Sequence, residues 1–258
     1  EYPIDYVKWD HNRLVPVVDS AQTRGIYDLL DRLRAAHPKV EIESCASGGG
    51  RVDASILAHT HRVWLSDCID ALERLWMQHN AALFLPSAVT GSHVGALHSH
   101  TTGRALPMAF RAWVAAQRHF GFEMDIRKLT DDDAATLARV TAWYKANRRW
   151  MMAGEIHRLD AADPAVTAEM QIAADGSRFV LFSGQGDTSR QSLPRPLRLS
   201  GLDPAAHYAV TLINPEDAPK QSRGPNAIKT GPLGLSGRAL MSQGLLLPVA
   251  WPATRSSS

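Results

Sequence analysis

Short apolar segments that each end in a polar tip, separated by stretches of helical periodicity, are the feature that most restricts the fold of this chain. The three clearest segments are residues 2–9, 40–43 and 62–65, and their polar tips begin at Asp10, Ser44 and Ser66. Between the first two, residues 20–36 carry leucine and isoleucine at helical spacing with charges on the opposite face. Strand, helix and strand in alternation predict a parallel sheet with crossover helices.

The first tip, Lys8-Trp9-Asp10, presents a cation, an aromatic ring and a carboxylate in succession. In a parallel α/β barrel the loops after the strands form the open mouth, where ligands bind. A second carboxylate, Asp67, follows another strand of the same pattern. We therefore expect Asp10 and Asp67 to meet at one end of the sheet.

The motifs at these tips resemble those of the α-galactosidases of glycoside hydrolase family 36. The similarity covers several ordered segments, namely residues 8–13, 43–53, 64–71, 91–94, 100–104 and 120–130. It implies an α/β fold, with part of a (β/α)8 barrel followed by a small antiparallel β-sandwich. It also implies a metal-independent reaction with no cofactor, on α-galactoside oligosaccharides of the raffinose and melibiose type.

Carried over by position, the resemblance implies that Asp10 is the nucleophile and Asp67 the general acid and base. Retaining glycosidases hold two such carboxyl groups about 5 Å apart. Asp10 should be ionised, which Lys8 favours, and Asp67 should start protonated.

The resemblance also implies a set of substrate-binding residues around the two carboxylates. These are Lys8, Trp9, Asn12, Cys45, Ser47 and Gly48. The chain departs from the family pattern at Ala46 and Ser47, which replace the usual serine and first glycine. Fine sugar preference therefore does not follow from the motif.

Other kinds of site fit the sequence less well. The histidines at 93, 98 and 100 straddle a loop and do not predict a metal site. The glycines at 48–50 lack the Lys-Ser or Lys-Thr that a phosphate loop needs. Cys45 and Cys68 are expected to be free thiols of a reducing compartment, so we expect a cytoplasmic protein. Nucleic-acid binding is not indicated, because 28 basic residues against 26 acidic ones give a net charge of only +2.

The second half of the chain has a different pattern. A helix is expected near residues 104–117 and another near 131–151, and from about Val166 short strands alternate with turns. We expect a domain boundary at residue 160, with the barrel portion in 1–160 and the β-sandwich in 161–258. An uninterrupted apolar run long enough to cross a membrane is absent from the sequence.

The position of the motifs limits what this chain can do alone. The nucleophile motif, which the resemblance assigns to the middle of the barrel, stands at residue 8. The chain is therefore expected to be the C-terminal part of a longer enzyme that, by resemblance, assembles into a tetramer. Two alternatives to hydrolysis stay open: a galactosyl transferase of the raffinose-synthase kind, and a carbohydrate-binding fragment without catalysis.

Overall fold

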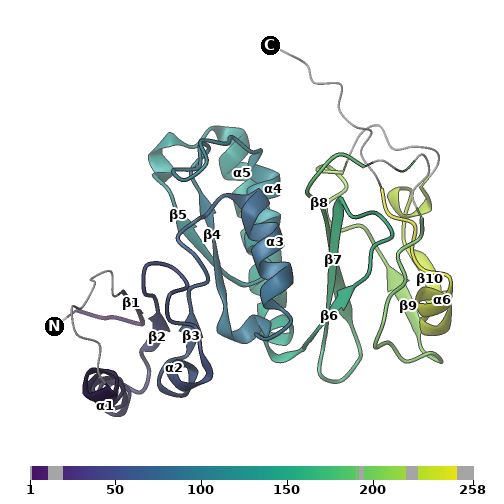
Figure 1. The fold of residues 1–258 in the computed structure, drawn as a ribbon. Coiled ribbons are helices and arrows are strands. Elements are labelled where there is room, and N and C mark those ends of the chain that lie inside the picture. Colours follow the sequence, from purple (N-terminus) through teal and green to yellow (C-terminus); the bar gives the residue numbers. More distant parts are fainter. Residues whose placement is uncertain (1, 11–19, 190, 192–194, 219–225, 249–258) are drawn as a thin grey trace. The chain divides into compact units, whose positions relative to one another are not determined.

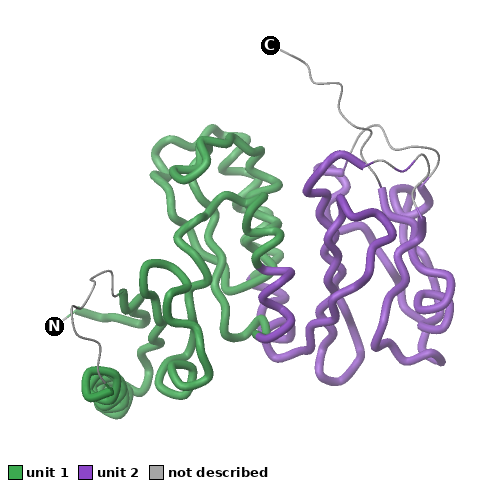
Figure 2. Tube along the Cα trace, viewed as in Figure 1, with its two compact units in different colours: residues 1–77, 85–144 green, residues 78–84, 145–258 purple. Residues whose placement is uncertain are grey.

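The computed structural model describes residues 2–10, 20–189, 191, 195–218 and 226–248 (Figure 1). The chain divides into two compact units (Figure 2). The first comprises residues 1–77 and 85–144, and the second comprises residues 78–84 and 145–258. Each unit is described separately below.

Parallel strands form the framework of the first unit. Strands β1 (Tyr6–Trp9), β2 (Glu41–Ser44) and β3 (Arg62–Val63) make one sheet in that order, and β4 (Gly91–Gly95) pairs with β5 (His119–Glu123). A parallel bridge between Val63 and Thr90 links β3 to the start of β4. The described residues therefore contain five successive parallel strands.

Helices follow these strands in regular alternation. They are α1 (Ser20–Ala36), α2 (Ala54–His59), α3 (Ala71–Ala81), α4 (Met108–Ala115) and α5 (Asp131–Ala153), with short 3-10 turns at Ser87–Val89 and Ile126–Lys128. One strand and one helix per repeat is the architecture of a (β/α) barrel. The partial barrel predicted from the sequence is thus confirmed.

Apolar side chains on one face of the β1–β3 sheet hold α1 and α2 in place. Leu30 of α1 and Ile56 of α2 are fully buried against Ile42 and Val63, and Trp9 packs against the same cluster. Figure 1 shows α1 and α2 on the same side of these strands. The strand tips are therefore carried by a sheet that is anchored from one face.

The helix expected at residues 104–117 is shorter than predicted. It begins only at Met108, after Pro107 at the N-cap position. A residue before proline is pushed out of helical conformation, so the turn from residue 104 to 106 cannot join the helix. This leaves Arg104 free to enter an ion-pair network described below.

The second unit is built from antiparallel strands. Strands β6 (Glu155–Leu159), β7 (Val166–Ile172) and β8 (Phe179–Gln185) form one sheet, and β9 (His207–Val210) pairs with β10 (Leu233–Ser236). The expected antiparallel region is confirmed, although β6 begins before Val166, where the first strand was expected. The residues after β10 form the short helix α6 (Gly237–Ser242), after which Leu245 bridges to Leu197.

One apolar core fills this unit. It joins residues of both sheets and of α6, with Met170 and Leu240 fully buried at its centre. The 3-10 turn Ala227–Lys229 adds Ile228 to the same core.

The predicted domain boundary at residue 160 falls between β6 and β7 and stays a prediction. None of the helices in the described part of the chain has the length and apolar character needed to cross a membrane.

Candidate active site

The register of the first sheet brings three strand tips together. Lys8 of β1 pairs with Glu43 of β2, and Ser44 of β2 pairs with Val63 of β3. The ladder continues past the strands, because the Cys45 N–H donates to the Trp9 carbonyl at 2.9 Å and the Trp64 N–H donates to the Ser44 carbonyl at 2.8 Å. The residues that follow each strand therefore emerge side by side.

Cys45 contacts both of the carboxylates predicted from the sequence. Its Sγ is 3.9 Å from Oδ1 of Asp67, and its thiol also hydrogen-bonds the side chain of Asp10. Cys45 is fully buried, whereas Asp10 and Asp67 are exposed. The structure thus brings Asp10, Asp67 and Cys45 into one cluster, in which the thiol contacts both carboxylates.

Burial raises the pKa of the Cys45 thiol to about 11, and the hydrogen bond to Asp10 acts in the same direction. The Gly48 N–H and the Lys8 charge oppose this shift only in part. A thiolate is the reactive form of cysteine, so Cys45 is an inert thiol near neutral pH. It can donate one hydrogen bond to a neighbouring carboxylate but cannot serve as a nucleophile there.

Glycines allow the loop after β2 to lie directly against the loop after β3. A Cβ at Gly49 would lie 2.4 Å from the Leu65 carbonyl oxygen, and one at Gly48 would lie 2.9 Å from the Asp67 nitrogen. Gly48 also has φ +76°, a left-handed conformation. Ser47 beside it has φ +49°, a backbone conformation that glycine adopts more readily than serine.

Lys8 points to the same side of the sheet as Asp10, because side chains two residues apart in a strand share a face. Its Nζ lies 4.5 Å from the centre of the Trp64 ring, a cation–π contact. The ring of His93 also contacts Trp64, at 4.4 Å between centroids, and Nδ1 of His93 lies 3.1 Å from Oε2 of Glu123. That interaction holds the pKa of the Glu123 carboxyl below its usual range.

The other predicted site residues have different outcomes. Ser47 is exposed and Gly48 buried in the loop after β2, next to Asp67. Trp9 is not brought to the site, because it alternates with Lys8 and Asp10 and packs toward α1 and α2 on the opposite face. Asn12 lies outside the described residues.

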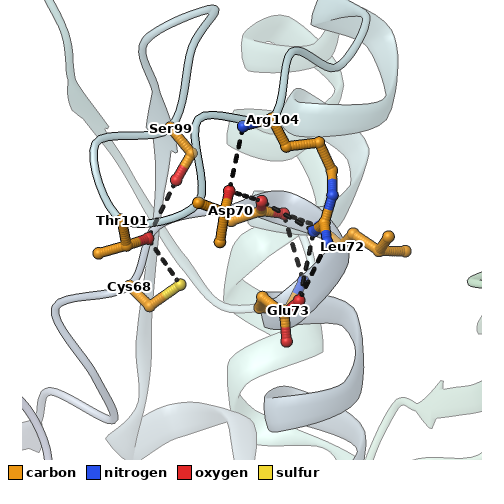
Figure 3. A network of polar contacts seen from close by, with 8 residues as sticks. Cys68, Asp70, Leu72, Glu73, Ser99, Thr101 and Arg104 are labelled. Atoms are coloured by element: carbon orange, nitrogen blue, oxygen red, sulfur yellow. Dashed lines mark hydrogen bonds and ion pairs between the residues drawn. The ribbon is translucent and has the colours of Figure 1, made fainter.

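A polar network anchors the segment that follows Asp67 (Figure 3). The Asp70 carboxylate accepts from the Leu72 N–H at 2.8 Å, which caps the start of α3, and from Arg104 Nη1 at 2.8 Å. It also accepts from the Thr102 hydroxyl. Burial would raise the pKa of the Asp70 carboxyl, but these hydrogen bonds outweigh it and leave the pKa below its usual range.

Sequence reasoning missed residues that support this site from a distance. Trp64 stands within one of the family motifs, but the sequence alone assigns no function to its side chain. It also assigns none to Glu123 or Arg74. Their contacts come from different strands and helices, so no local pattern marks them. Within the described residues, no group of three or more histidine, cysteine or acidic side chains is arranged to hold a metal ion.

Comparison with known proteins identifies the family of this chain. The melibiase family matches residues 1–154, and the C-terminal domain of glycosyl hydrolase family 36 matches residues 166–257. The chain belongs to the melibiases of glycosyl hydrolase family 36. It is also 36% identical to the alpha-galactosidase of Escherichia coli over 98% of its own length, and 36% identical to a probable alpha-galactosidase C of Aspergillus terreus over 80%.

Solved structures of family 36 share the fold. The alpha-galactosidase AgaB of Geobacillus stearothermophilus superposes with a TM-score of 0.80 at 32% identity, covering 96% of this chain. A variant of AgaA from the same organism, in complex with raffinose, has a TM-score of 0.78 at 31% identity over 99%. The chain covers 37% of the Escherichia coli protein and 34% of each of these two structures, so it spans about a third of their length.

The glycine loop generates a first prediction. Gly49→Ala should lower the free energy of unfolding by about 2 kcal/mol, because the new Cβ would meet backbone that cannot move aside cheaply. Gly25→Ala is the matched control, since Gly25 lies in α1 with open space around it and should gain about 0.5–1 kcal/mol from helix propensity. Urea denaturation measures both. Equal stability of Gly49→Ala and wild type would contradict the close packing.

The Asp70 network generates a second prediction. Asp70→Ala should lower the free energy of unfolding by about 2–3 kcal/mol, since it removes a helix cap and a buried charge-assisted hydrogen bond. Glu73→Gln, whose side chain is 43% exposed, should cost less than about 0.5 kcal/mol.

The same Asp70 variant also has an expected pH dependence. Because the folded-state pKa of Asp70 lies below its unfolded value, its stabilisation is complete above the unfolded value. It is lost as the pH falls through the folded-state pKa. Denaturation of wild type and Asp70→Ala from pH 7 downward should therefore converge in acid, and a constant gap would contradict the assignment.

The state of Cys45 generates a third prediction. At pH 8 a thiol of pKa about 11 is ionised in only about a thousandth of molecules, so iodoacetamide should label Cys68 well before the buried Cys45. Peptide mass mapping over time measures the two rates. In urea both cysteines should react alike, and equal rates in the folded protein would show that Cys45 is accessible and ionised.

Proposed function

We propose that this chain carries the catalytic carboxylate pair of a retaining α-galactosidase, which releases terminal α-linked galactose from oligosaccharides of the raffinose and melibiose type. The observation that carries the proposal is the Cys45 thiol in contact with both Asp10 and Asp67. The shared contact with Cys45 keeps the two carboxylates near each other, and the retaining mechanism uses a pair about 5 Å apart. Inverting enzymes need a wider gap, because a water molecule must stand between sugar and base.

In the first step Asp10 attacks the anomeric carbon of galactose. The bond from that carbon to the leaving oxygen breaks, and Asp67 gives its proton to that oxygen, so the leaving sugar departs as a neutral alcohol. Galactose is then held as an ester of Asp10. Both carboxylates are exposed in the described part of the chain, which supports access by a sugar.

In the second step Asp67, now ionised, takes a proton from water. The water oxygen forms a bond to the anomeric carbon, the ester bond to Asp10 breaks, and galactose is released with its original configuration. A sugar hydroxyl in place of water would give transfer. The same two carboxylates serve both outcomes, so product analysis is part of the test.

Lys8 and the glycine loop support substrate orientation. Lys8 shares a strand face with Asp10 and keeps its ammonium group near the Trp64 ring, from which it can donate to sugar hydroxyls. Cys45 and Gly48 lie beside Asp67, and Ser47 directly precedes Gly48 in the same loop. Relatives with bound raffinose or stachyose support an oligosaccharide substrate for this chain.

Substitution of the two carboxylates in the complete gene product tests the proposal. Asp10→Asn should reduce turnover of both p-nitrophenyl α-galactoside and melibiose at least about 10³-fold, since no ester can form. Asp67→Asn should reduce kcat/KM for melibiose about 10²-fold or more, but for the nitrophenyl substrate much less, because nitrophenolate leaves without a proton.

Asp175→Asn is the matched control. Asp175 is an acidic residue of the β7–β8 turn that accepts from the Ser177 N–H, and its substitution should leave both rates unchanged. The wild-type enzyme should form more free galactose than transfer product, because water is its main acceptor. Full activity of Asp10→Asn would overturn the proposal, and predominance of transfer would favour a galactosyl transferase.

A further inference from the structure

Arg74 is a buried cation beside the proposed acid and base, and the mechanism above gives it no role. It lies in the first turn of α3 and is 1% exposed. Its Nε donates to the Cys68 carbonyl at 2.8 Å, and its Nη2 donates to the Ser66 carbonyl. The two accepting carbonyls belong to the residues immediately before and after Asp67.

The helix geometry explains how Arg74 reaches these carbonyls. Asp70 caps α3, and the Arg74 N–H makes an early hydrogen bond of the helix to the Asp70 carbonyl at 2.8 Å. Side chains in a helix lean toward its N-terminus. The guanidinium group therefore points back over the segment that precedes the helix, and its planar fork can take two acceptors at once.

The segment that carries Asp67 has little regular structure of its own. Strand β3 ends at Val63, and α3 begins at Ala71. Further contacts hold this segment: the Cys68 N–H donates to the Ser66 hydroxyl at 3.1 Å, the Cys68 thiol lies 3.1 Å from the Thr101 hydroxyl, and Gly48 approaches closely. The Asp70 network described above fixes its far end. The two bonds from Arg74 thus fix the backbone on both sides of the exposed Asp67 carboxylate.

Arg74 is connected to the nucleophile side through Trp64. Its guanidinium carbon lies 4.2 Å from the centre of the Trp64 ring, and Lys8 Nζ lies 4.5 Å from the same centre. Trp64 is fully buried, so the ring cannot shift without repacking. One rigid side chain therefore sets the spacing between the cation near Asp10 and the cation that holds the Asp67 segment.

We infer that Arg74 is a positioning residue for the general acid and base. By bracketing Asp67 with two carbonyl hydrogen bonds, and by stacking on Trp64, it holds that carboxylate where it can protonate the leaving oxygen. The inference rests on the proposed function of Asp67. A shift of about 1 Å in a catalytic group can cost about 10²-fold in rate, so a loose segment would impair proton delivery.

The leaving group of the substrate separates this role from mere support of the fold. Arg74→Lys keeps the charge but loses the fork, and Arg74→Gln is a smaller second variant that can still donate to one carbonyl. Each should reduce kcat/KM for melibiose at least about tenfold more than kcat/KM for p-nitrophenyl α-galactoside. The complete gene product is used, with activity expressed per folded molecule after measurement of Tm.

Arg111→Lys is the matched control. Arg111 is also buried, at 5% exposure. Its guanidinium group likewise bridges two carbonyls: Nε donates to the Leu106 carbonyl at 2.9 Å, and Nη1 donates to the Gly95 carbonyl at 2.6 Å. Those carbonyls do not flank Asp67. Its loss should lower Tm while the ratio of the two kcat/KM values stays at the wild-type level.

The Asp67→Asn variant separates a failure of the proposed function from a failure of the positioning role of Arg74. If Asp67→Asn leaves the substrate ratio unchanged, the proposed function fails first. If Asp67→Asn shifts the ratio but neither Arg74 variant does, the positioning role is overturned. A shift with Arg74→Lys that disappears in the Asp67→Asn background supports it, because Arg74 then acts through Asp67.

Discussion

The main chain after β2 lies directly on the main chain after β3, and this contact sets the distance between the residues of the site. A Cβ at Gly49 would come within 2.4 Å of the Leu65 carbonyl oxygen, so a side chain cannot be accommodated there. The parallel register of β1, β2 and β3 then places Asp10 next to Cys45. Cys45 touches Asp67 through a sulfur atom 3.9 Å from its carboxylate. Loss of the close backbone contact would move Asp67 away from this cluster.

Buried charges on α3 hold the segment that bears Asp67 from its other side. Asp70 caps the helix and binds Arg104, while Arg74 reaches back to the carbonyls on either side of Asp67. Burial of the Arg74 guanidinium lowers its pKa to about 10, which still leaves it charged near neutral pH. Hydrogen bonds from Nε and Nη2 to these carbonyls offset part of the cost of burying the cation, so the carbonyls and Arg74 stabilise one another. The short segment between β3 and α3 is fixed by this interaction rather than by regular structure.

The sequence allowed the repeating framework to be predicted because its signals are local. Helix α1 shows apolar residues at helical spacing. Each motif at a strand tip is a continuous run of residues in the sequence. The role of Trp9 in substrate binding stays a prediction, and strand alternation places its side chain on the other face from Lys8 and Asp10. Arg74 could not be found in this way, because it reads as an ordinary charged residue of a helix. Its partners at Ser66 and Cys68 are defined only once the helix start is fixed by Asp70. Likewise, Pro107 delays α4 in a way that hydrophobic spacing alone does not show.

The stereochemistry of hydrolysis tests the central claim most directly, because it depends on the separation of the two carboxylates. Proton NMR of the complete gene product acting on p-nitrophenyl α-galactoside distinguishes the anomeric signals of galactose before mutarotation mixes them. The proposed ester on Asp10 predicts that α-galactose appears first, because two inversions restore the original configuration. Release of β-galactose first would mean that water attacks directly across a wider gap, and would contradict the account.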